Sequence, residues 1–244
     1  MLYACEEEKK ENLIFTNYNI EKAYKKCNPE KGNCTFINLN FPVAKGKETV
    51  AKKINDSIEH HIIEIVSGFN PDNNPETMEE IVEGFIANYG SYREDFPETD
   101  IPWEATVFAE ITLETPKLLS IDFNSYTFTG GAHGYGSNTY MNFNPETGAV
   151  YTHKDLFTPA FKDFVEKDFR NKENIPQGEN INSTGMFFEN DEFHLPANIG
   201  FRNDKLILTY NPYEIAAYVE GQKTYEYNLN EVSNYLKIDF SEKE

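Results

Sequence analysis

The chain has 244 residues, of which 39% are hydrophobic and 14% aromatic, so it is long and apolar enough to fold around a substantial core and is not a disordered chain. Its formal net charge of −19, from 41 acidic and 22 basic residues, argues against a nucleic-acid-binding protein and against contact with an anionic membrane surface. A cationic partner would be attracted to a protein with this charge. Beyond the first few residues, no apolar run is long enough to span a bilayer.

The first 12 residues are similar to the start of a mature bacterial lipoprotein. Leu2-Tyr3-Ala4-Cys5 resembles a lipobox, the motif that ends at the cysteine to which a lipid is attached, and a charged run from Glu6 to Asn12 follows it. The positive and apolar regions that precede a lipobox are missing, so an ordinary cysteine at a ragged terminus is the alternative. We expect residues 1–12 to form a lipoprotein N-terminus and tether, with Cys5 lipidated and this anchor as the only membrane contact.

The two remaining cysteines, Cys27 and Cys34, enclose a turn-forming segment between two extended stretches. In an oxidising compartment a bridge between them would contribute about 2–3 kcal/mol by restricting the unfolded chain. We therefore expect a disulfide between Cys27 and Cys34. We expect no metal or cofactor, because no second pair of cysteines or histidines stands at the spacing that a zinc site needs.

Hydrophobic periodicity predicts both helices and strands in residues 13–145. Apolar residues recur every three or four positions over residues 47–67, as in an amphipathic helix, and every second position over residues 103–113, as in a strand with one buried face. The other elements expected here are two strands within residues 13–40, the second ended by Pro42, a helix over residues 74–90 capped by Asn74, and strands over residues 118–128 and 135–143.

Residues 146–240 continue the mixture of elements. The pattern predicts a helix that begins near Thr158, strands over residues 187–195, 205–210 and 224–229, and short helical pieces over residues 213–219 and 230–236. Because strands and helices do not alternate regularly, the fold class is α+β, with antiparallel sheets and a few helices packed on one face, arranged as two intertwined subdomains. We place the boundary between them after residue 145, giving regions 13–145 and 146–240.

A glycine-rich turn is the most informative motif. Residues 128–135 read Phe-Thr-Gly-Gly-Ala-His-Gly-Tyr, and three glycines in so short a stretch allow backbone conformations that other residues resist. His133 either bonds to the backbone and holds the turn, contacts a ligand, or takes part in catalysis. Catalysis needs partners, and the chain has no nucleophile elbow and no phosphate-binding loop, although its many carboxylates leave a glycosidase-type pair open.

A second motif occupies residues 211–221 and reads Asn-Pro-Tyr-Glu-Ile-Ala-Ala-Tyr-Val-Glu-Gly. Pro212 fixes a turn directly after a predicted strand. The side chains of Tyr213, Ile215 and Tyr218 then either plug the end of the sheet or recognise a ligand.

The two motifs together resemble a known family. Between them stand Asn144-Pro145-Glu146-Thr147-Gly148 and Asp155-Leu156-Phe157, and this order is similar to that of the RsiV-like extracytoplasmic domains, which occur in a lysozyme-sensing anti-sigma factor and in the accessory region of the peptidoglycan deacetylase PdaC. The sigma-binding segment, the membrane helix and the deacetylase domain of those proteins have no counterpart in this sequence. The resemblance therefore implies a ligand-binding module without the family's catalytic residues.

We expect a non-catalytic lipoprotein of the bacterial cell envelope, periplasmic or surface-exposed, that binds a cationic protein such as lysozyme or cell-wall glycan. The alternative is an envelope hydrolase that acts on peptidoglycan or another glycan through His133 and nearby carboxylates. The expected ligand-binding residues come from the two motifs and are Thr129, Gly130, Gly131, His133, Gly134, Tyr135, Tyr213 and Glu214.

Overall fold

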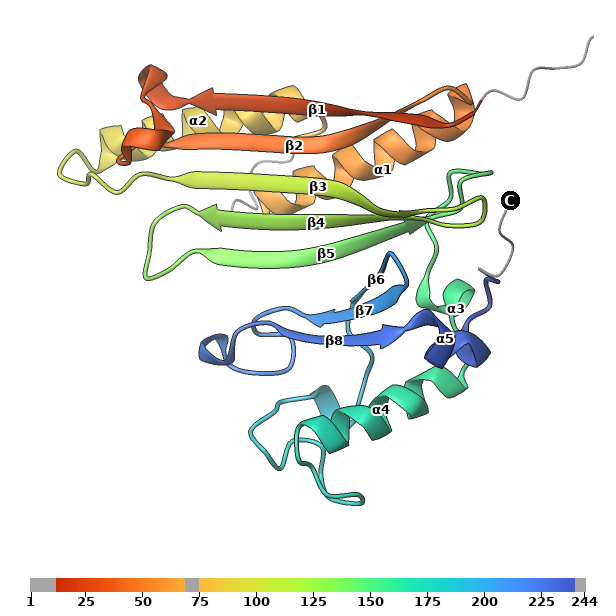
Figure 1. Cartoon of the computed structure of the whole chain (residues 1–244). Coiled ribbons are helices and arrows are strands. Elements are labelled where there is room, and N and C mark those ends of the chain that lie inside the picture. The colour runs from red at the N-terminus through yellow and green to blue at the C-terminus, as the bar shows by residue number, and fades with distance from the viewer. Residues whose placement is uncertain (1–11, 69–74, 240–244) are drawn as a thin grey trace, which may run out of the picture.

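The computed structural model describes residues 12–68 and 75–239, so Cys5, most of the expected tether and Asn74 lie outside the described residues. Two sheets make up the frame of the fold (Figure 1). No helix in the described ranges is long and apolar enough to cross a membrane. The predicted α+β class is confirmed, and the predicted division after residue 145 stays a prediction.

The first sheet contains five strands in the order of the chain. They are β1 (Ile14–Ala23), β2 (Phe36–Lys45), β3 (Glu104–Glu114), β4 (Leu119–Phe128) and β5 (Tyr135–Phe143). All neighbouring pairs are antiparallel except β2 and β3, which run parallel, whereas the sequence predicts antiparallel sheets. The parallel pair is possible because two helices connect these strands and allow the chain to cross back over the sheet.

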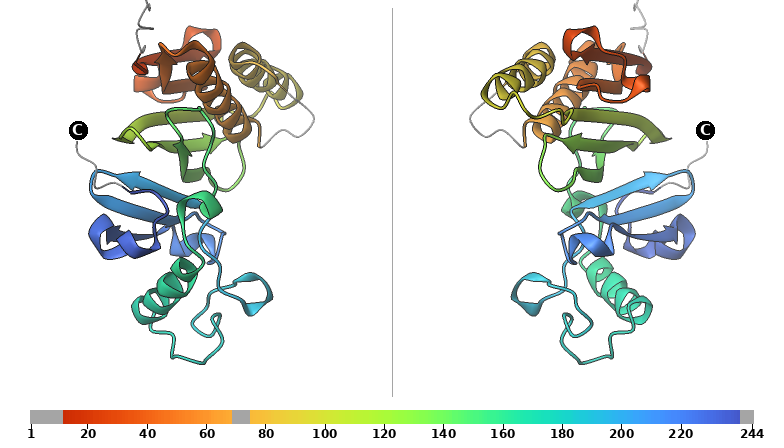
Figure 2. Two further views of the ribbon diagram at one scale, coloured as in Figure 1. Left: turned by 90° about the vertical axis from the view of Figure 1, so that its right-hand side faces the viewer. Right: turned by 90° about the vertical axis from the view of Figure 1, so that its left-hand side faces the viewer.

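These connecting helices, α1 (Glu48–Ser67) and α2 (Met78–Asp95), lie on the same side of the first sheet (Figure 2). Ile54, Ile58 and Ile62 of α1 are fully buried and pack into one cluster with Leu39 and Phe123 of the sheet. The predicted amphipathic helix is confirmed, because the three- or four-residue repeat places these isoleucines on one face.

Two boundaries in this part of the chain differ from the predictions. Thr77, not Asn74, caps α2: its side chain accepts a hydrogen bond from the backbone N–H of Glu80 at 3.2 Å. Pro42 lies inside β2 and faces Asn17 of β1, and β2 pairs with β3 only as far as Asn40. Proline is tolerated there because the N–H that it lacks has no strand to bond on that side.

The second sheet is antiparallel and lies between the first sheet and α4 (Ala160–Lys172) in Figure 1. Its strands are β6 (Asn198–Arg202), β7 (Lys205–Tyr210) and β8 (Lys223–Asn228), and the short helices α3 (His153–Leu156) and α5 (Leu229–Val232) complete this half. The strand predicted over residues 187–195 is wrong. Phe188 and Phe193 lie in a loop, and their buried rings pack against Phe169 of α4.

Polar side chains of the first sheet form hydrogen bonds with backbone groups of β6, on the edge of β6 that does not pair with β7. The hydroxyl of Thr112 donates to the carbonyl of Phe201 at 2.6 Å, and the N–H of Phe201 donates to the hydroxyl of Ser120 at 3.0 Å. The side-chain amide of Asn142 donates to the carbonyl of Ile199 at 2.7 Å. Thr112, Ser120 and Asn142 are each less than 10% exposed, so these bonds satisfy backbone groups that are closed off from water.

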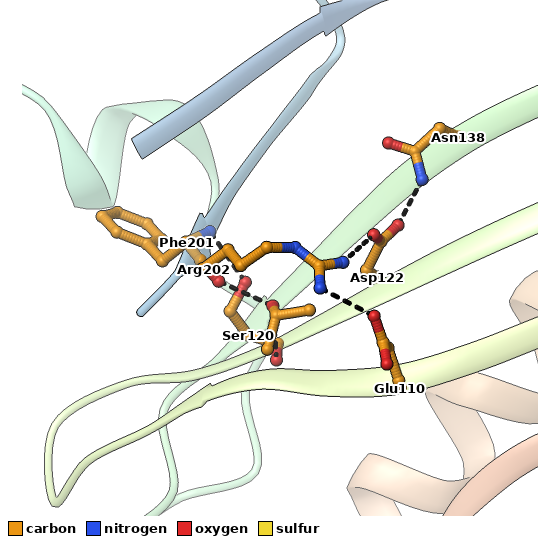
Figure 3. A network of polar contacts seen from close by, with 7 residues as sticks. Glu110, Ser120, Asp122, Asn138, Phe201 and Arg202 are labelled. Carbon is orange, nitrogen blue, oxygen red and sulfur yellow. Dashed lines mark hydrogen bonds and ion pairs between the residues drawn. The ribbon is translucent and has the colours of Figure 1, made fainter. Parts of the chain in front are cut away.

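Arg202, at the end of β6, adds an ionic contact to this junction (Figure 3). Its guanidinium donates to Glu110 at 2.7 Å and also contacts Asp122, which accepts from the side chain of Asn138 as well. Although burial opposes its charge, the two carboxylates raise the pKa of Arg202. Burial raises the pKa of Asp122, while the bonds from Arg202 and Asn138 act in the opposite direction.

Gly200, in the middle of β6, has no room for a side chain. A Cβ atom at this position would lie 1.9 Å from Cδ1 of Tyr140 on β5, so the tyrosine ring rests directly on the glycine backbone. Burial, together with the carboxylate of Asp122, raises the pKa of Tyr140 to about 12, as is expected for a ring held inside this junction.

We therefore predict that Gly200→Ala lowers the free energy of unfolding by about 2–3 kcal/mol, because the inner atoms of the Tyr140 ring cannot move aside without loss of packing. Urea denaturation followed by circular dichroism measures the effect. Gly136→Ala on β5 is the matched control, since its Cβ atom would approach no heavy atom closer than 3.7 Å. Equal stability of the two variants would contradict the close packing of the two sheets.

His61 of α1 also faces the first sheet. Its Nε2 atom lies 2.7 Å from the hydroxyl of Thr139, and its ring packs edge-on against Phe123 at 4.9 Å. Burial lowers the pKa of His61 below its usual value of 6.5, and Glu64 opposes this only in part. The unfolded chain therefore binds the proton more readily than the folded protein, so the contribution of neutral His61 to stability is lost as the pH falls below about 6.5.

We predict that wild-type protein loses more stability than His61→Gln when the pH is lowered from about 7.5 to about 5.5. Chemical denaturation at the two pH values provides the measurement. His60→Gln is the control, because the side chain of His60 on the same helix is 73% exposed. The prediction fails if His61→Gln and wild type lose stability in parallel.

Candidate functional site

The glycine-rich turn connects β4 to β5, and its glycines have two different functions. Gly130 and Gly131 adopt φ angles of 97° and 93°, a region that favours glycine. Gly134 is buried beneath the side chain of Tyr126, where a Cβ atom would lie 2.3 Å from the tyrosine hydroxyl. Two glycines thus shape the turn, and the third lets an aromatic ring lie flat on the backbone.

His133 lies at the exposed tip of this turn. Its Nδ1 atom is 2.9 Å from the carbonyl oxygen of Gly134, and because a carbonyl only accepts, Nδ1 carries the proton in this bond. The imidazole stacks on the ring of Tyr218 at 4.0 Å with an angle of 19° between the planes. Nε2 lies 3.5 Å from the hydroxyl of Tyr213. The ring is therefore oriented by the backbone and by two tyrosines of the second motif.

The side chain of Asn211 holds the second motif against β5. It donates to the carbonyl of Asn138 at 2.9 Å and accepts from the N–H of the same residue at 2.9 Å, in the way that a neighbouring strand would. Tyr218 adds a bond from its hydroxyl to the carbonyl of Gly134 at 2.9 Å. Two segments about 80 residues apart in the sequence are thereby fixed side by side.

The backbone of Tyr213 is strained. It has a φ of 71° and follows Pro212 in a turn that is closed by a bond from the N–H of Glu214 to the carbonyl of Asn211 at 3.0 Å. Glycine or asparagine is usual at this position of such a turn, and a tyrosine there costs on the order of 1 kcal/mol or more. Tyr213 is nevertheless 53% exposed, so burial of its side chain does not offset the free-energy cost of this backbone conformation.

We call the four rings of Tyr126, His133, Tyr213 and Tyr218 the aromatic cluster. Tyr213 lies 5.4 Å from Tyr218, which in turn stacks on His133, and Tyr126 covers Gly134 next to them. Beside the cluster is a hollow of about 360 Å³. The residues that line it are Thr127, Phe128, Thr129, Gly130, His133, Tyr135 and Tyr213.

The structure brings most of the expected ligand-binding residues together. Thr129, Gly130, His133, Tyr135 and Tyr213 all line the hollow. Whether they bind a ligand stays a prediction.

The remaining expected residues have other positions. Gly131 faces open space at the tip and Gly134 lies under Tyr126. Both carboxylate oxygens of Glu214 accept backbone bonds, from Ala197 at 2.8 Å and from Asn211 at 3.0 Å, so this side chain holds the loop.

The aromatic cluster also contains Tyr126 and Tyr218, which are not among the ligand-binding residues expected from the sequence. Tyr126 alternates outward on β4 and is 38% exposed. A large aromatic residue on the polar face of a strand, just before a glycine turn, is the signal that could have identified it. Tyr218 belongs to the second motif, but its stacking on His133 depends on how the two motifs dock.

The side chains that line the hollow carry aromatic rings, hydroxyl groups and one imidazole. None of the described residues that line the hollow has a carboxylate, and no group of three metal-binding side chains occurs in the described parts of the chain. Glu104 is the carboxylate that affects the aromatic cluster: burial raises the pKa of Tyr126, and Glu104 adds to this shift. A histidine whose Nδ1 bonds to the backbone and whose ring is stacked is well placed to present a flat surface.

Comparison with known proteins relates this arrangement to two families. Residues 28–135 match the family model described as Deacetylase PdaC, and residues 154–226 match the one described as Protein of unknown function (DUF3298). No curated protein matches the chain.

Two crystal structures of DUF3298 family proteins have a similar fold. The protein from Pseudomonas aeruginosa PAO1 shares 18% identity at a TM-score of 0.61, over 93% of this chain and 96% of that one. The protein from Bacteroides fragilis NCTC 9343 shares 19% identity at a TM-score of 0.64, over 95% of this chain and 96% of that one. At these identities the likeness shows the fold alone. Together with the family matches it confirms the resemblance that the motifs indicate: this chain carries a PdaC-type segment followed by a DUF3298 segment, consistent with an RsiV-like family of extracytoplasmic modules.

Proposed function

We propose that this protein is a non-catalytic binding module of the cell envelope and that its aromatic cluster contacts a cationic protein of the lysozyme type. The observation that carries the proposal is Tyr213, which is held in a strained backbone conformation and yet is 53% exposed. Strain that burial does not repay is typical of residues that are kept for recognition.

The cluster has the composition of a protein-binding surface. Tyrosine is enriched among the residues that contribute most to binding energy, because a rigid aromatic ring buries a large area at a small cost in side-chain entropy. Here Tyr218 and His133 are already stacked, and the backbone bonds of Asn211 and Gly134 fix the two segments. Little side-chain freedom is left for a partner to remove on binding.

The charge of the protein indicates which partner the cluster meets. A net charge of −19 attracts a strongly basic protein and accelerates its association at low salt. It offers no such attraction to a neutral or anionic glycan, although the same rings would stack on sugars. The hydrolase alternative has less support, since Glu214 is engaged by backbone amides and no described carboxylate lines the hollow.

We predict that hen egg-white lysozyme binds the wild-type protein and that Tyr213→Gly weakens this binding at least tenfold, while the free energy of unfolding stays unchanged or rises by up to about 1 kcal/mol. Glycine relieves the strained φ but removes the exposed ring. Calorimetric titration at low and at physiological salt, together with urea denaturation, measures both effects. Ile14→Ala is the control, because Ile14 is 56% exposed at the opposite end of the first sheet.

Other outcomes separate the alternatives. If Tyr213→Gly lowers stability and leaves binding intact, the ring serves packing and the proposal is wrong. Absence of lysozyme binding at low salt, with binding of soluble peptidoglycan fragments, would assign the cluster to glycan. Turnover of those fragments that is lost in His133→Ala would support the hydrolase.

We further propose that the protein is exported, lipidated at Cys5 and oxidised at Cys27 and Cys34. In the structure the latter two cysteines are bridged, with their Cα atoms 5.5 Å apart, at the end of the β1–β2 hairpin. Such bridges form and persist in oxidising compartments and are rare in the cytosol.

We predict that the protein, produced from its natural gene, appears in the membrane fraction with a diacylglyceryl group on Cys5. Iodoacetamide should label Cys27 and Cys34 only after reduction, because the thiols are oxidised in the folded protein. Mass spectrometry of peptides reads both modifications, and Cys5→Ser should release the protein from the membrane. Free thiols at residues 27 and 34, with an unmodified Cys5, would indicate a protein that is not exported.

A further inference from the structure

The first sheet has a free edge at β1, on the side opposite to the aromatic cluster. In the described part of the chain, β1 ends the strand order and pairs only with β2 (Figure 1). The backbone N–H of Tyr24 donates to the carbonyl of Thr35 at 2.9 Å, and this pair continues the register that joins β1 to β2. Even-numbered residues therefore bond to β2, and the backbone N–H and C=O groups of Asn17, Asn19 and Glu21 point outward.

A groove of about 680 Å³ lies beside this edge, on the helix side of the sheet. Tyr18 and Ile20 of β1 and Phe41 of β2 supply apolar surface from the sheet, and Met78 and Val82 of α2 supply it from the helix. A strand added to β1 would direct every second side chain toward the helix side, into this groove.

The rim of the groove is acidic. Glu21, Glu59, Glu79 and Glu83 line it, against a single cation, Lys22, which already pairs with Glu83. None of Glu21, Glu59 and Glu79 forms an ion pair with a described residue. Burial and the neighbouring Asp56 raise the pKa of Glu59, and Lys52 opposes this shift only in part.

We propose that β1 and this groove form a second binding site, which takes an extended basic polypeptide segment as an additional strand. The segment's backbone pairs with the outward groups of Asn17, Asn19 and Glu21. Its alternate lysine or arginine side chains lay their aliphatic stems on the apolar floor and their charged ends on Glu59 and Glu79. Backbone pairing gives affinity and the acidic rim gives the preference for cationic side chains.

Charge distinguishes this occupant from the other chains that could cover the edge. Residues 6–11 and residues 240–244 of this protein each carry a net negative charge, and residues 69–74 contain no basic residue. A second copy of the chain would bring another net charge of −19 to the same edge. A basic segment from a different protein is the occupant that the rim favours. This site is independent of the function proposed for the aromatic cluster.

The test uses a short peptide of alternating lysine and valine, titrated into the wild-type protein and followed by calorimetry. We expect binding that weakens with salt and that Glu59→Gln combined with Glu79→Gln reduces about fivefold or more. Glu189→Gln, an exposed acidic position in the other half of the molecule, should leave the affinity unchanged, as should Tyr213→Gly. A glutamate–valine peptide should not bind.

Backbone pairing is tested separately. The same lysine–valine peptide with alternate backbone nitrogens methylated keeps its charge but cannot form a strand, so we expect it to bind at least tenfold more weakly. Asn19→Pro removes one outward N–H and should weaken the unmodified peptide in the same way. Equal binding of methylated and unmodified peptide would overturn the proposal, as would equal affinity of the double glutamine variant and wild type. Concentration-dependent dimerisation that Asn19→Pro abolishes would assign the edge to a second copy and also overturn it.

Discussion

The fold depends on which groups bond to the backbone N–H and C=O groups of β6 on the edge that does not pair with β7. A buried strand edge with unpaired backbone groups is costly, and most proteins pair such an edge with another strand or leave it in water. Here the hydroxyls of Thr112 and Ser120 and the amide of Asn142 take the place of a strand. Because each of these side chains bonds to one particular backbone group, the two sheets meet in one register, and Gly200 provides the space that the Tyr140 ring needs.

Hydrogen bonds from a polar side chain to backbone groups of a strand also position the candidate site. Asn211 bonds to both backbone groups of Asn138, and this places residues 211–221 beside the glycine turn. The stacking of His133 on Tyr218 follows from that placement and does not require a covalent or local constraint. An exposed aromatic surface made from two distant segments is therefore rigid because its support is polar and buried.

Local patterns in the sequence predict those parts of the fold whose neighbours are close or regular. The repeat of isoleucines predicts α1, the alternation in residues 103–113 predicts β3, and the glycines predict the turn after Phe128. Local patterns fail where contacts between residues that are distant in the sequence determine the structure. Residues 187–195 are predicted as a strand, but Phe188 and Phe193 lie buried in a loop. The strand β6 has no strand signal, because Gly200 stands where a large residue would normally pack. In the same way, the contact between His133 and Tyr218 depends on the bonds of Asn211.

The two edges of the first sheet differ in a way that has functional consequences. At β5 the edge is closed by polar side chains and by the second sheet, so that its geometry is fixed before any partner arrives. At β1 the edge carries asparagines and Glu21, and proteins usually protect an exposed edge with lysine, proline or a bulge. Among the residues of β1, Lys22 is the one lysine, and its charge is already neutralised by Glu83. An edge protected mainly by negative charge repels copies of an acidic protein but remains open to a basic strand, so one charge distribution serves both solubility and selectivity.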